Sequence, residues 1–176
     1  MGTVLGAMRN VRWHELQHAY GSASQVPGVL SRIAWGDAPT SDEALSDLER
    51  WIGTPPVFDS TAAAVPFLWE LAATDTVRDR AGVLELLATI LAAGNPEHPA
   101  WTRAAHDAVA AGRSTAALLG SAPSPPGAPS PPGVPDAGGS SPARTVRAAA
   151  ARLLAAIDRH TCPACAGLPP REARVR

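Results

Sequence analysis

Apolar residues recur at helical spacing along most of this chain. The longest such stripe contains Val77, Ala81, Leu84, Ala88 and Leu91, and it ends before Gly94. Positions that repeat every three to four residues share one face of an α-helix, which can then be buried. The same pattern predicts further helices over residues 10–20, 26–36, 40–53, 66–71, 101–112, 114–119 and 142–159. No segment predicts a strand, so we expect an all-α protein.

Several helix starts are marked by capping residues. Thr40 is followed three residues later by Glu43, and Thr76 by Asp79, as in a capping box. Pro66 is expected in the first turn of a new helix, where a missing amide proton costs nothing.

A segment rich in proline, glycine and serine interrupts the helical pattern. Residues 122–127 read A-P-S-P-P-G, and residues 128–133 repeat them. Such a segment is predicted to be an extended, disordered insert, either a spacer or a ligand for an SH3-like domain. The expected organisation is a helical-repeat domain over 1–120, the insert over 121–141, a last repeat helix over 142–160 and a flexible tail over 161–176.

Three of the expected helices share one spacing of apolar positions. The seam Val77, Ala81, Leu84, Ala88 is matched by positions 146, 150, 153 and 157, and by 41, 45, 48 and 52, of which 41 is the polar Ser41. A shorter apolar stretch precedes each one, at residues 26–30, 65–68 and 115–119. We therefore interpret the chain as three helical hairpins, with an irregular helical bundle as the alternative.

These hairpins resemble HEAT repeats, whose second helix commonly begins with a Val-Arg pair. Here the pairs are Val77-Arg78 and Val146-Arg147, whereas the first unit has Ser41-Asp42. The resemblance spans roughly residues 26–157 without the insert. It implies a short α-solenoid of about three HEAT-like hairpins, which bury a shared core and leave a ridged face for a partner.

Composition and charge exclude some functions. The formal net charge is -1, with 15 basic and 16 acidic residues, so no strong field would attract nucleic acid or an anionic membrane. The N-terminal apolar run is too short for a signal peptide, and no stretch approaches the roughly 18 apolar residues of a spanning helix. We therefore expect a cytoplasmic protein that binds neither.

One short motif suggests catalysis. His14-Glu15-Leu16-Gln17-His18 fits H-E-x-x-H, in which two histidines one helical turn apart can bind zinc. With residues 43–47 downstream, this stretch resembles thermolysin-like peptidases. The resemblance implies His14, His18 and Glu43 as zinc ligands, Glu15 as general base and Asp47 as the residue that orients a ligand. No strand that could hold a substrate precedes His14, so this remains an alternative.

Two cysteines lie near the C-terminus. Cys162 and Cys165 have a C-x-x-C spacing that, with His160 just before it, is typical of half a zinc site or of a redox pair. A tetrahedral metal site needs four ligands, and only three are local here. We interpret the cysteines as part of an exposed tail. The five tryptophans are expected to fill core or inter-helix space.

The sequence thus favours a non-catalytic HEAT-like scaffold or adaptor that binds another protein, with no cofactor and no catalytic residue. The zinc peptidase is the alternative from a different class. A second alternative is an immunity or regulatory protein that masks one target, for which a strongly acidic face is missing.

Overall fold

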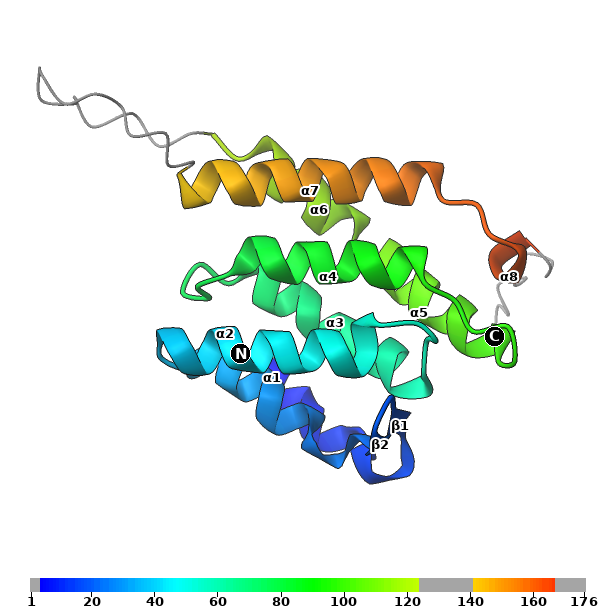
Figure 1. Cartoon of the computed structure of the whole chain (residues 1–176). Coiled ribbons are helices and arrows are strands. Elements are labelled where there is room, and N and C mark those ends of the chain that lie inside the picture. Colours follow the sequence, from blue (N-terminus) through cyan, green and yellow to red (C-terminus); the bar gives the residue numbers. More distant parts are fainter. Residues whose placement is uncertain (1–3, 124–140, 167–176) are drawn as a thin grey trace, which may run out of the picture.

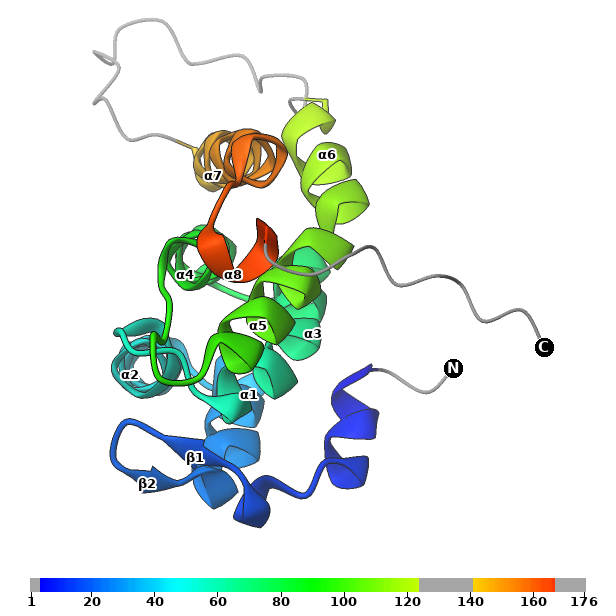
Figure 2. The same ribbon diagram turned by 90° about the vertical axis from the view of Figure 1, so that its right-hand side faces the viewer.

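The computed structural model describes residues 4–123 and 141–166, and the fold of this part is all-α apart from one very short hairpin. Helices form two layers (Figures 1 and 2). The first layer contains α2 (Ala38–Leu48), α4 (Arg80–Ala92) and α7 (Pro142–Arg159). The second contains α1 (Val26–Trp35), α3 (Asp59–Ala73), α5 (Pro99–Ala111) and α6 (Arg113–Ser121).

Three helical hairpins stack in this arrangement. Helix α1 packs on α2, α3 on α4, and α6 on α7, while α4 also packs on α7. Helix α5 is an additional element that packs on α3 and α4 and leads into α6. The predicted units are therefore present as hairpins. The expected insert and tail lie mostly outside the described residues, at 124–140 and 167–176.

The N-terminal region differs from the sequence prediction. Instead of a helix over 10–20, it contains the 3-10 helices η1 (Val4–Asn10), η2 (Trp13–Glu15) and η3 (Ala23–Gln25), with an antiparallel hairpin of β1 (Gln17–His18) and β2 (Gly21–Ser22). Gly21 has φ of +126°, a conformation that glycine adopts without strain, and it turns the chain there. The Trp13 indole is buried and lies near Phe67, with ring centroids 5.9 Å apart, so a tertiary contact determines its orientation.

Three helix starts also differ from the prediction. Asp37, rather than Thr40, caps α2, because its side-chain oxygen accepts a hydrogen bond from the Thr40 amide at 3.1 Å. Pro66 lies inside α3 instead of in the first turn of a new helix. Asp79, rather than Thr76, is the N-cap of α4, and its side chain accepts a hydrogen bond from the Gly82 amide at 2.7 Å. The helix therefore begins after Val77. After α2, the chain continues as a π-helical turn, η4 (Glu49–Gly53).

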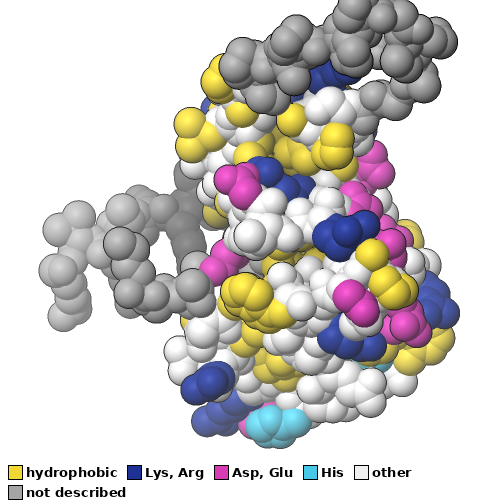
Figure 3. Space-filling view, turned by 90° about the vertical axis from the view of Figure 1, so that its left-hand side faces the viewer, with side chains coloured by type: hydrophobic (Ala, Val, Ile, Leu, Met, Phe, Trp, Pro, Cys, Tyr) yellow, Lys and Arg dark blue, Asp and Glu magenta, His cyan; other side chains and the backbone are white. Residues whose placement is uncertain are grey.

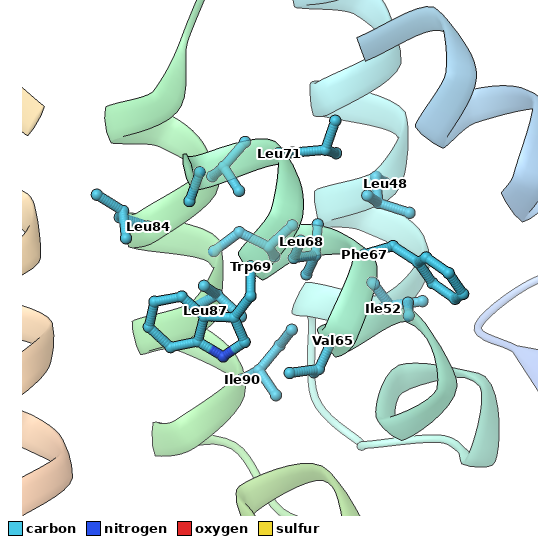
Figure 4. Close-up of a cluster of buried hydrophobic side chains, with 14 of the residues drawn as sticks. Leu48, Ile52, Val65, Phe67, Leu68, Trp69, Leu71, Leu84, Leu87 and Ile90 are labelled. Atoms are coloured by element: carbon cyan, nitrogen blue, oxygen red, sulfur yellow. The ribbon is translucent and has the colours of Figure 1, made fainter. Parts of the chain in front are cut away.

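The core lies around α3. Figure 4 shows Leu68, Trp69 and Leu71 of α3 between side chains of α2, η4 and α4. Trp69 also packs on the backbone at Gly112, where a Cβ atom would lie 2.0 Å from its ring. The other labelled side chains of the cluster are also buried: Leu48, Ile52, Val65, Phe67, Leu84, Leu87 and Ile90.

None of the helices in the described part of the chain is long and apolar enough to span a membrane.

Candidate functional site

The H-E-x-x-H segment does not form a zinc-binding helix. His14 lies on the single turn η2, whereas His18 lies on β1, so the two rings are not one helical turn apart. His14 is exposed, with Nε2 3.7 Å from Glu15 Oε1. His18 is buried, stacks on Trp51 at 4.8 Å between centroids, and its Nδ1 accepts a hydrogen bond from the Tyr20 amide at 3.1 Å.

The other residues of the predicted peptidase site lie on α2. Glu43 is exposed, and Asp47 forms an ion pair with Arg50. Within the described residues, His14, His18 and Glu43 are not gathered into a group of metal donors. The predicted ligand set required a helix over residues 10–20, and this helix is not present. The structure therefore does not support these residues as zinc ligands.

A different group of donor atoms lies next to the C-terminal end of α7. His106, His160, Cys162 and Cys165 each offer one nitrogen or sulfur atom, and these four atoms lie within 4.8 Å of one another. The sulfurs of both cysteines lie 3.4 Å from His106 Nδ1. Cys165 Sγ lies 3.6 Å from His160 Nε2. This is the one such group of three or more metal donors among residues 4–123 and 141–166.

Three elements bring these side chains together. His106 lies on α5, and His160 follows the last residue of α7. The cysteines flank the start of the short helix α8 (Pro163–Ala166), in which the amides of Cys165 and Ala166 both donate to the Cys162 carbonyl. Helix α8 packs on α5 at the end of the stack where α7 finishes (Figure 2).

His106 is the buried member of the group, and a backbone hydrogen bond holds its ring. It is 3% exposed, and its Nε2 lies 2.8 Å from the Ala93 carbonyl oxygen. Because a carbonyl only accepts, Nε2 carries a proton, and Nδ1 is the ring nitrogen that faces the two sulfurs. The ring is therefore held in an orientation suited to coordination.

Burial affects the ionisation of this group. Desolvation lowers the pKa of His160, and the neighbouring His106 lowers it further, which favours a neutral imidazole. Burial raises the pKa of Cys165 to about 11, with hydrogen bonding to Cys162 and its charge adding to the effect. Both cysteines are free thiols. Chemically, such a group can bind a thiophilic metal ion or undergo thiol oxidation.

A second feature is an apolar hollow between η1 and α1. It has a volume of about 630 Å³ and is lined in part by Leu5, Met8, Trp13, Pro27 and Trp35. Trp35 is 75% exposed, so the prediction that every tryptophan fills core or inter-helix space is wrong for this residue.

The interpretation of the cysteines as an exposed tail is also corrected. Both are half-buried against α5, and the missing fourth donor is His106, which precedes Cys162 by 56 residues. The close spacing of His160 and the two cysteines in the sequence indicates three of the four metal donors. No local pattern, however, distinguishes His106 from other histidines on amphipathic helices.

No protein-family model, curated protein or solved structure matches this chain.

Proposed function

We propose that this chain is a non-catalytic, HEAT-like scaffold that binds another protein along its stacked helices. The observation that supports this proposal is the exposed indole of Trp35 beside the apolar hollow between η1 and α1. Tryptophan is enriched at the centres of protein interfaces because it buries a large apolar area at small conformational cost. A solvent-exposed tryptophan bordering a hollow of about 630 Å³ is suited to that role.

The chemistry of the hollow suggests a mainly apolar contact with a polar rim. Met8 and Pro27 contribute apolar surface, while Arg9 and His14 contribute polar groups. The end of the molecule at which α2, α4 and α7 begin has interleaved acidic and basic side chains and separate hydrophobic patches (Figure 3). We therefore expect a partner that inserts an apolar side chain and does not depend on one dominant sign of charge.

The proposal is tested by quantitative affinity capture with three forms of the chain. Trp35→Ala removes the proposed contact residue. Leu118→Ala is the matched control, because Leu118 is 73% exposed but lies on α6. We expect at least one partner to be retained by wild type and by Leu118→Ala and lost with Trp35→Ala. Equal capture by all three forms would contradict a role for this surface.

An immunity or regulatory protein that masks one target is a variant of this proposal. It differs in what binding does to the partner. Binding through the Trp35 surface would then inhibit the partner's activity, and Trp35→Ala would relieve the inhibition. The peptidase alternative is not proposed, since His14 and His18 do not share a helix.

A further inference from the structure

We propose that His106, His160, Cys162 and Cys165 bind one Zn²⁺ ion. Two thiolates and two imidazoles form one of the ligand sets that zinc uses in structural sites. The four donor atoms lie within 4.8 Å of one another, and they come from α5 and from the segment that follows α7. The proposal is independent of the proposed binding surface at Trp35, which lies on α1.

The separations between donor atoms suit a tetrahedral ion. With Zn–S near 2.3 Å and Zn–N near 2.0–2.1 Å, tetrahedral ligands lie about 3.3–3.8 Å from one another. Three of the six separations fall in this range, at 3.4 Å from His106 Nδ1 to each sulfur and 3.6 Å from Cys165 Sγ to His160 Nε2. All four donor atoms lie within 4.8 Å of one another, so an ion would draw the more widely separated donors closer together.

The hydrogen bond behind His106 supports coordination independently of these separations. A metal-binding histidine usually donates its other ring N–H to a carboxylate or a backbone carbonyl, which fixes the tautomer and the ring orientation. His106 Nε2 has this relationship with the Ala93 carbonyl, at 2.8 Å. The nitrogen that faces the sulfurs is therefore the one free to coordinate.

The donor types select the metal. Thiolate and imidazole ligands favour zinc over calcium or magnesium, which prefer oxygen. Four protein ligands fill a tetrahedral site and leave no position for water or substrate, so the ion would be structural. It would crosslink α5 to the C-terminal end of α7.

This crosslink would add to the packing of α7 on α4 and α6. Arg113 and Asp158 pair at 2.7 Å, and Arg152 and Glu85 at 3.1 Å, but the side chains of both pairs are largely exposed. Exposed ion pairs contribute little to stability, whereas a metal bridge joins distant segments through strong bonds. The ion would therefore fix α7 against the rest of the stack.

The experiment measures zinc on the full, untagged chain, purified with a non-thiol reductant. Elemental analysis and native mass spectrometry give the stoichiometry, and competition with a chromophoric chelator gives the affinity. We expect one zinc ion per chain. We expect His106→Ala, His160→Ala and Cys162→Ser/Cys165→Ser each to weaken binding by at least the roughly 10–100-fold that loss of an outer-shell partner costs.

The controls are His14→Ala/His18→Ala, which removes the H-E-x-x-H histidines, and His98→Ala, which removes an exposed histidine stacked on Trp101. Both should retain wild-type affinity. Circular dichroism verifies that each variant is helical, and half-buried His160 provides a test should the buried His106→Ala variant fail to fold. Substoichiometric zinc in the wild type, or undiminished affinity in the cysteine variant, would overturn the proposal.

Discussion

His106 Nδ1 lies 3.4 Å from the sulfur of Cys162, although 56 residues separate them in the chain. Helix α5 supplies the ring, and the segment after α7 supplies the thiol. The end of α7 is thus connected to an earlier part of the stack through chemically reactive side chains as well as through apolar packing.

Zinc should stabilise the folded chain. A ligand that binds only the native state contributes about 4 kcal/mol when its free concentration is 1,000 times Kd. For a chain of this size, that corresponds to a rise in Tm of roughly 8–16 °C. Thermal unfolding with zinc and with a chelator, both under reducing conditions, measures the difference. Cys162→Ser/Cys165→Ser should show no such dependence on zinc.

Gly112→Ala should destabilise the core. An added Cβ would lie 2.0 Å from the Trp69 ring, so either the indole or the α5–α6 junction must move. Overpacking of this kind costs about 1–3 kcal/mol. Gly28→Ala is the matched control, because an added Cβ there meets no atom within 4 Å and alanine favours helix α1. Chemical denaturation should find the first variant less stable than wild type and the second equally or more stable.

Glu49→Gln should stabilise the protein at neutral pH. Although the Glu49 side chain is exposed, partial desolvation raises its pKa above the ordinary value of 4.5, and the charges of Asp79 and Glu85 raise it further. The charged carboxylate therefore destabilises the folded state. The free energy of unfolding is highest below pH 4.5, where Glu49 is protonated, and it decreases as the pH rises through the native pKa. The gain in Tm should appear at pH values above the native pKa and vanish below pH 4.5. A gain in Tm that stays constant as the pH is lowered would contradict this assignment.

Asp158→Asn should have the opposite pH dependence. Hydrogen bonding to Arg113 lowers the pKa of Asp158 below its ordinary value of 3.8. The pair therefore stabilises the fold above pH 3.8, and the contribution is lost as pH falls through the lower native pKa. Asp158→Asn should be slightly less stable than wild type at pH 7, and the two should converge in acid. A constant difference down to pH 2 would contradict the assignment.

The helices with continuous apolar seams were predictable from sequence. Helix α7 has the predicted bounds, because Pro142 begins it and Val146, Ala150 and Leu153 recur on one face. The N-terminal segment was not predictable in this way. There, the positive φ of Gly21 and the contact of Trp13 with Phe67 outweigh a helical spacing of apolar residues.

The candidate metal group was predictable only in part. His160, Cys162 and Cys165 lie close together in the sequence and indicate three donors. His106 could not be identified, since its role depends on how α5 packs beside α8 and on the Ala93 carbonyl behind its ring. The H-E-x-x-H motif misled in the opposite direction. Its residue types suit zinc, but its backbone is not the α-helix that would bring the two histidines together.

The most direct test of the zinc site is a Co²⁺ titration of the metal-free, reduced chain, followed by absorption spectroscopy. Cys162 and Cys165 are the two cysteines of the sequence, so cobalt–thiolate charge transfer can arise only from them. We expect intense tetrahedral d–d bands and thiolate charge transfer that saturate at one equivalent, are displaced by zinc and are abolished in Cys162→Ser/Cys165→Ser. A weak octahedral spectrum without thiolate charge transfer would contradict a zinc site at these cysteines.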